Sequence, residues 1–118
     1  MAALAAQARS HELGVGLAFT PQTDPEQAAD VAEPVDLVLC MSINPGYSGQ
    51  AFMPEAFGRV ERLRDRLPEG RHIQVDGGIG RDNVPRLREA GADLFVAGTS
   101  IFGAGDIAAA YRELVELA

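Results

Sequence analysis

The sequence predicts a parallel α/β fold. Short apolar runs alternate with helical patterns along the chain, and each run is bounded by Gly, Pro or Asp. Nearly continuous apolar runs are typical of parallel strands that are covered on both faces. The runs start roughly 20–35 residues apart, which is the length of a βα unit. An open doubly wound sheet and part of a (βα)₈ barrel both fit, although a full barrel usually needs about 250 residues.

Four strands are expected, and all are short and apolar. They are Gly14–Phe19, Asp36–Met41, His72–Asp76 and Leu94–Ala97. The alternation of side chains in the third strand places Gln74 and Asp76 on one face and Ile73 and Val75 on the other.

Helices are expected before, between and after these strands. The Ala-rich residues 1–10 lack the features of a signal peptide and predict a surface helix. Thr23 or Asp24 can cap a helix that begins at Pro25. Three later helices are expected: Glu55–Leu67 after Pro54, Asn83–Ala90 capped by Asp82 and ended by Gly91, and Ile107–Leu117 capped by Asp106.

Charged and reactive residues narrow the function classes. The net charge of −7 argues against nucleic acid as a partner, and no apolar run is long enough to cross a membrane. The single cysteine, Cys40, excludes an internal disulfide, lacks zinc-site spacing and suggests a cytoplasmic setting. The chain has no lysine, which excludes a Schiff-base or Walker-type lysine, so backbone amides or Arg must hold any phosphate.

Glycine-rich segments follow three of the expected strands. The segment Gly46-Tyr47-Ser48-Gly49 can direct successive N–H groups toward an anion, although an ordinary Asn-Pro-Gly turn also fits. Asp76 precedes Gly77-Gly78 at the end of the third strand, the position of a catalytic acid or base in a barrel; a common Asp-Gly turn is the alternative. Gly98-Thr99 can present N–H groups at the start of a short helix and so bind phosphate; a simple strand-to-helix turn is the alternative. Because two glycine-rich strand ends follow in succession, phosphate binding is the favoured interpretation.

Three motifs together resemble the ribulose-phosphate 3-epimerase family: MSINPGYSGQAFMPE, IQVDGGI and AGADLFVAGTSIFG. The preceding segment GVGLAFTPQT is similar to the family's fifth strand, and the likeness extends from about Ala2 to Ala118. The resemblance implies that residues 1–118 form one partial domain, the C-terminal half of a TIM (βα)₈ barrel with strands five to eight.

The resemblance also implies roles for individual residues. Asp76 corresponds to an acid that ligates a metal and moves a proton, and Met41 lines the pocket. Ser48 and Thr99 depart from the family's usual glycine and serine, and Thr20 from a common asparagine, but the first two changes keep the backbone donors. The implied phosphate-binding residues are Gly46, Tyr47, Ser48, Gly49, Gly77, Gly78, Gly98 and Thr99.

The implied activity is an isomerase reaction that interconverts D-ribulose 5-phosphate and D-xylulose 5-phosphate by metal-assisted proton transfer at C3. The family draws a second acid and two histidine ligands from its first strands, which have no counterpart here. The resemblance implies a divalent Zn, Fe, Mn or Co ion for the family. Because those ligands have no counterpart here, this fragment need not retain the metal, and this chain alone is expected to be inactive or nearly so. It should pair with itself or with a missing N-terminal half. Another phosphate-binding barrel enzyme, or a non-catalytic phosphosugar-binding half-barrel, is the alternative.

Residues outside these motifs are expected to be structural. His72 begins its strand and lies about 13 Å from Asp76, at the opposite end of the barrel. His11 lies at the end of the first helix. Cys40 alternates away from Met41 and should pack beneath the helices. Arg59, Arg62 and Arg66 are expected on a solvated helix face.

Overall fold

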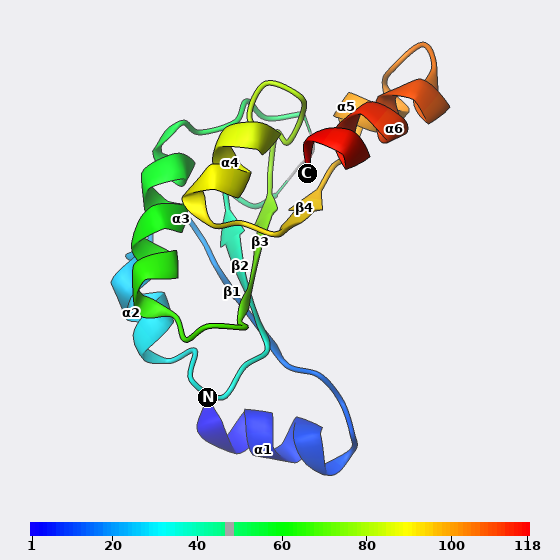
Figure 1. The fold of residues 1–118 in the computed structure, drawn as a ribbon. Coiled ribbons are helices and arrows are strands. Elements are labelled where there is room, and N and C mark those ends of the chain that lie inside the picture. The colour runs from blue at the N-terminus through cyan, green and yellow to red at the C-terminus, as the bar shows by residue number, and fades with distance from the viewer. Residues whose placement is uncertain (47–48) are drawn as a thin grey trace.

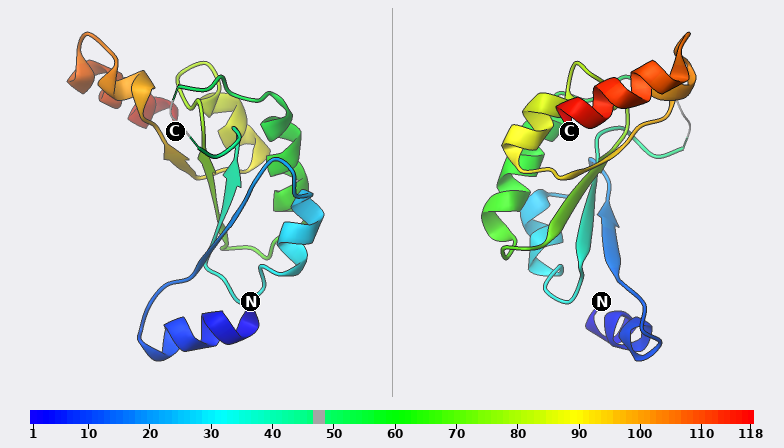
Figure 2. Two further views of the ribbon diagram at one scale, coloured as in Figure 1. Left: turned by 180° about the vertical axis from the view of Figure 1, so that it is seen from behind. Right: turned by 45° about the vertical axis from the view of Figure 1, so that its right-hand side comes forward.

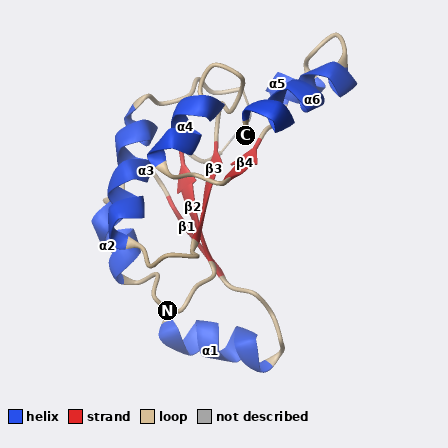
Figure 3. Ribbon diagram, viewed as in Figure 1, coloured by secondary structure: helices blue, strands red, loops and turns tan. Residues whose placement is uncertain are grey.

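The computed structural model describes residues 1–46 and 49–118. Helices and strands alternate as expected up to β4, which is followed by two helices (Figures 1 and 3). The elements are α1 (Ala2–Ser10), β1 (Gly16–Phe19), α2 (Pro25–Asp30), β2 (Leu37–Met41), α3 (Glu55–Arg66), β3 (His72–Asp76), α4 (Val84–Ala90), β4 (Leu94–Val96), α5 (Thr99–Phe102) and α6 (Ile107–Leu117).

The four strands form one parallel sheet in the order β1-β2-β3-β4. A doubly wound sheet reverses its strand order at a switch point, and this sheet does not. The helices α2, α3 and α4 lie on one face only (Figure 2). Both features are those of consecutive units in a (βα)₈ barrel, so the predicted fold class, half of a TIM barrel, is confirmed.

The covered face of the sheet carries the core. One row across the sheet joins Phe19, Cys40, Val75 and Phe95, which are register partners from β1 to β4. Cys40 and Val75 are fully buried, as are Val60 and Leu63 of α3, which pack in the same cluster. The expected burial of Cys40 is therefore confirmed, and Ile73 and Val75 are both buried, as residues on one face of β3 would be.

The opposite face carries side chains that the helices do not cover. The register row Ala18, Leu39, Gln74 and Leu94 lies on this face, and Leu94 is 40% exposed. Val96, further along β4, is 39% exposed. Parallel sheets normally bury both faces, so this apolar surface is the interior side of an incomplete barrel.

The observed elements differ from the expected ones at several boundaries. β1 begins at Gly16 rather than Gly14, β2 at Leu37, and β4 ends at Val96. Asp82 is not the cap of α4: the N-cap is Asn83, and the helix starts at Val84.

Two expected helix ends are confirmed. Gly91 ends α4 with φ of 122°, and the Asp106 carboxylate accepts a hydrogen bond from the Ala109 N–H at 3.0 Å.

The prediction of a solvated arginine face on α3 was wrong in one residue. Arg59 is half-buried, and its guanidinium lies 5.3 Å from the centroid of the Phe19 ring. It also donates to the carbonyls of Thr20 and Thr23 at 3.0 and 2.6 Å. Arg62 and Arg66 are exposed as predicted. Arg59 therefore ties α3 to the turn after β1, a contact of which helical periodicity gives no sign.

Candidate functional site

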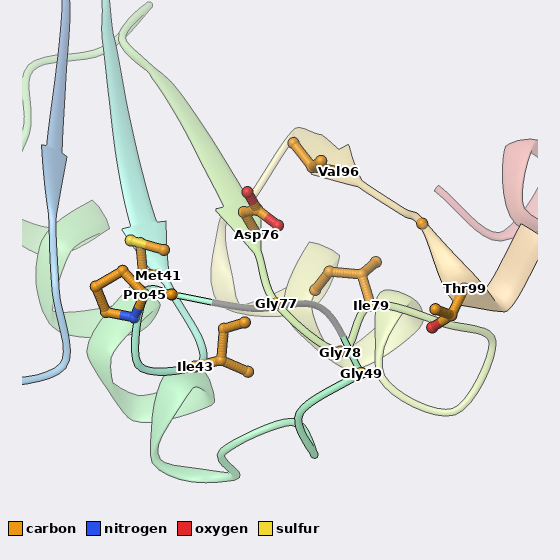
Figure 4. Close-up of a pocket in the computed structure, with 12 residues that line it drawn as sticks. Met41, Ile43, Pro45, Gly49, Asp76, Gly77, Gly78, Ile79, Val96 and Thr99 are labelled. Carbon is orange, nitrogen blue, oxygen red and sulfur yellow. The ribbon is translucent and has the colours of Figure 1, made fainter.

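The carboxyl ends of β2, β3 and β4 open into one pocket of about 340 Å³ (Figure 4). Register brings them together, because Met41 pairs with Asp76 and Asp76 with Val96. All three glycine-rich segments reach this pocket, although they lie far apart in the sequence. Its lining residues are Met41, Ile43, Pro45, Gly46, Gly49, Asp76, Gly77, Gly78, Ile79, Val96, Gly98 and Thr99.

Asp76 is the acid of this pocket. It is the last residue of β3, its side chain is on the uncovered face, and it is half-buried. Figure 4 shows the carboxylate between Met41 of β2 and Val96 of β4, two apolar neighbours. The predicted pocket residue Met41 thus lies beside the predicted acid.

The turn after Asp76 has a backbone that requires glycine. Gly77 and Gly78 have φ angles of 125° and 66°, where side chains are rarely found. A Cβ on Gly77 would lie 2.5 Å from a side-chain carbon of Ile43, and a Cβ on Gly78 would lie 2.6 Å from the backbone nitrogen of Phe52. The segment after β2 therefore packs directly onto the turn after β3.

Two buried polar side chains that the sequence analysis did not single out hold this turn. The Ser42 hydroxyl donates to the carbonyl of Gly77 at 2.6 Å, and the Ser42 N–H donates to the carbonyl of Asp76 at 2.9 Å. Asn83 donates from Nδ2 to the carbonyl of Gly78 at 2.8 Å and accepts from the Gly80 N–H at 3.0 Å. A serine directly after a strand and an asparagine before a helix are too common to have indicated these roles.

The segment after β2 contributes Gly46 and Gly49 to the pocket. Tyr47 and Ser48, the other two predicted phosphate-binding residues here, lie outside the described residues. Asn44 connects this segment to its surroundings: its side-chain oxygen accepts from Gln22 at 2.6 Å, and its backbone carbonyl accepts from Gln50 at 2.7 Å.

Gly98 and Thr99 follow β4 and also line the pocket. Gly98 is the N-cap residue of the four-residue helix α5, and both residues are exposed. Every described residue to which the sequence analysis assigned phosphate binding therefore borders the same cavity.

The described residues of the pocket do not form a metal site of their own. Among the described residues, no three His, Cys, Asp or Glu side chains gather closely enough to hold an ion. Asp76 is the single such side chain among the described residues that line the pocket. One carboxylate does not fit the three or four protein ligands of a transition-metal site.

The other reactive residues lie away from the pocket. His72 is at the opposite end of β3, where its Nδ1 lies 2.8 Å from the Asp93 carboxylate. The Asp93 carboxylate also accepts from the Ile73 N–H at 2.8 Å, so the pair ties β3 to the start of β4. His11 is exposed at the end of α1. Burial raises the pKa of the Cys40 thiol, which keeps it protonated beneath α3.

A model of the family described as "Ribulose-phosphate 3 epimerase family" matches residues 1–102. The chain belongs to the ribulose-phosphate 3-epimerase family. The chain is 39% identical over 114 residues to ribulose-phosphate 3-epimerase 2 of Cupriavidus necator, covering 91% of this chain and 47% of that protein. It is 42% identical over 107 residues to the cytoplasmic isoform of ribulose-phosphate 3-epimerase from Oryza sativa subsp. japonica, covering 86% of this chain and 46% of that protein.

A solved structure resembles this epimerase-family chain over nearly its whole length. It is a 3-hexulose-6-phosphate synthase, with a TM-score of 0.72 and 25% identity over 98% of this chain and 55% of the synthase. The chain spans about half the length of the curated relatives it matches. No helix within the described residues is both long and apolar enough to span a bilayer.

Proposed function

We propose that the complete protein is a ribulose-phosphate 3-epimerase, and that this chain supplies its phosphate-binding turns and one of its two acid–base groups. The reaction interconverts D-ribulose 5-phosphate and D-xylulose 5-phosphate by proton transfer at C3. One observation carries the proposal: the pocket joins a single carboxylate to glycine-rich turns from three strands. Its lining contains no lysine or arginine among the described residues, so backbone N–H groups bind the phosphate.

Asp76 performs the proton transfer on one face of the sugar. The carboxylate removes the C3 proton, which is acidified by the neighbouring carbonyl, and the product is an enediolate. Return of a proton on the same face regenerates the substrate, whereas return on the opposite face inverts C3. Met41 and Val96 lie beside the carboxylate and give it apolar neighbours in the pocket.

Inversion needs a second acid on the opposite face of the sugar, which the described pocket residues do not provide. The chain alone is therefore inactive or nearly so in this proposal. Metal assistance, implied by the family, belongs to the complete enzyme, because Asp76 needs further ligands from outside the described chain.

The uncovered face of the sheet supports a proposed partner. Leu94 and Val96 remain exposed on the edge strand β4, and the other edge strand, β1, also lacks a neighbour on one side among the described residues. Exposed apolar surface and open strand edges both favour association. We place the first half of the barrel against this face, with self-pairing as the alternative, and the assembled enzyme in the cytoplasm.

A second candidate is a phosphosugar-binding half-barrel without catalysis. The observation that favours it is the single acid of the pocket. The similarity to a 3-hexulose-6-phosphate synthase supports a further alternative, another enzyme that acts on a phosphosugar. Both alternatives share the phosphate-binding turns, so only turnover separates them from the epimerase.

Ligand binding by the chain tests the proposal. Titrating isotopically labelled protein with D-ribulose 5-phosphate should shift the amide resonances of Gly46, Gly49, Gly98 and Thr99, because these residues border the pocket. Unphosphorylated D-ribulose should shift them far less, since the phosphate supplies most of the binding. Equal responses to both sugars, or responses confined to residues away from the pocket, would contradict it.

A further inference from the structure

The buried contacts of the glycine turn fix two peptide groups. Ser42 is 1% exposed and Asn83 is 7% exposed, and neither side chain lines the pocket. They hold the carbonyls of Gly77 and Gly78 on the interior side of the turn. The turn itself, with Ile79, does line the pocket.

Peptide planarity then sets the direction of two N–H groups. In a trans peptide the N–H points opposite to the carbonyl of the preceding residue. Since the Gly77 carbonyl points toward Ser42, the Gly78 N–H points away from Ser42; for the same reason the Ile79 N–H points away from Asn83. Within the described part of the chain, neither N–H donates to another protein group. Two successive N–H groups of a turn that lines the pocket are thus directed away from the buried side chains.

These two side chains fix the peptide orientation of the turn, in addition to its packing against Ile43 and Phe52. Two adjacent glycines have access to many backbone conformations, and rotation of one peptide would turn a carbonyl toward the pocket in place of an N–H. A carbonyl oxygen repels an anion. The buried hydroxyl and amide oppose that rotation, because a rotated peptide would leave them without partners in the interior.

We infer that Ser42 and Asn83 are positioning residues of the phosphate site, which hold the N–H groups of Gly78 and Ile79 toward the phosphate of the substrate. The inference rests on the proposed function and deepens it, because it assigns the orientation of the binding groups to two side chains that do not touch the ligand. Ser42 also holds the carbonyl of Asp76 through its N–H, so the same residue links the acid to the phosphate site.

Inorganic phosphate titrated into the labelled 118-residue chain provides the test. The Gly78 and Ile79 amide resonances should shift in a saturable way in the wild type. Ser42→Ala removes one hydroxyl, and Asn83→Asp removes the donor to Gly78 while keeping the acceptor for Gly80. Ser42→Ala should weaken phosphate binding about tenfold, the loss expected for one well-placed hydrogen bond. Asn83→Asp should weaken it at least as much, because its carboxylate also repels the anion. Ser10→Ala is the matched control, since it removes an exposed hydroxyl that donates to the Gln7 carbonyl at 2.6 Å; its affinity should equal that of the wild type.

The outcomes separate the two proposals. Folded Ser42→Ala and Asn83→Asp variants that bind phosphate as tightly as the wild type would overturn the inference and leave the proposed function intact. Wild-type shifts at Gly98 and Thr99, without any at Gly78 and Ile79, would do the same, and this result does not depend on whether the variants fold. The absence of phosphate binding anywhere in the pocket would instead remove the proposed function, and the inference with it.

Discussion

Replacing Gly78 with alanine should destabilise the protein strongly, because two separate costs apply. Its φ of 66° lies in the left-handed region, which costs a residue with a side chain roughly 1–2 kcal/mol. The new Cβ would also lie 2.6 Å and 2.8 Å from the backbone nitrogen and Cα of Phe52, which cannot move as a flexible side chain can. Such overpacking costs typically about 1–3 kcal/mol, so the free energy of unfolding should fall by about 2–5 kcal/mol.

Urea denaturation followed by circular dichroism measures this loss. With a slope of about 1–3 kcal/mol/M, a loss near 3 kcal/mol lowers the unfolding midpoint by about 1–3 M. Gly58→Ala is the matched control, because Gly58 is in α3, is exposed, and has open space within 4 Å of the point that an added Cβ would occupy. That substitution should raise stability by about 0.5–1 kcal/mol. Equal midpoints for the two variants would refute the packing of the Phe52 segment against the glycine turn.

Two further predictions follow from the charge and burial of single residues. Hydrogen bonds from the Val15 N–H and the Arg9 guanidinium lower the pKa of Asp36. Because this pKa is lower in the folded than in the unfolded state, the ionised carboxylate stabilises the fold above the unfolded-state pKa, and this stabilisation is lost as the pH falls. Asp36→Asn should therefore flatten the decline in melting temperature below about pH 4. An unchanged dependence of melting temperature on pH in that range would contradict this. The Cys40 thiol, buried and with a raised pKa, should react with a thiol reagent only after urea unfolds the chain. Rapid labelling of the folded protein would contradict the packing of β2 beneath α3.

The sequence was most informative where local chemistry sets the structure. The period of apolar runs located all four strands to within two residues, since buried parallel strands carry few polar residues. Gly91 and Asp106 correctly marked the end of α4 and the start of α6, because a glycine with positive φ and a carboxylate cap each depend on only a few neighbouring residues. Asp82 failed as a cap because the neighbouring Asn83 binds Gly78 and Gly80, which fixes the helix start one residue later.

The arrangement of the site depended on contacts across the sheet. Composition and spacing left a barrel and a doubly wound sheet equally open, and strand order decided between them. The role of Ser42 was not visible in the sequence, because its partners, Asp76 and Gly77, are more than thirty residues away. The exposure of Arg59 was wrongly predicted for the same reason. Its position on the helix predicts a solvent-exposed side chain, but the guanidinium contacts the Phe19 ring and the turn after β1.

Turnover by a completed barrel shows directly whether Asp76 moves the proton of the epimerase reaction. The chain would be joined to the first half of the Cupriavidus necator epimerase and assayed for conversion of D-ribulose 5-phosphate to D-xylulose 5-phosphate, with the isolated chain assayed in parallel. We expect activity in the joined protein, none in the isolated chain, and loss of activity in joined Asp76→Asn with phosphate affinity unchanged. Epimerase activity that survives Asp76→Asn would contradict the assignment of Asp76, because another group would then move the proton.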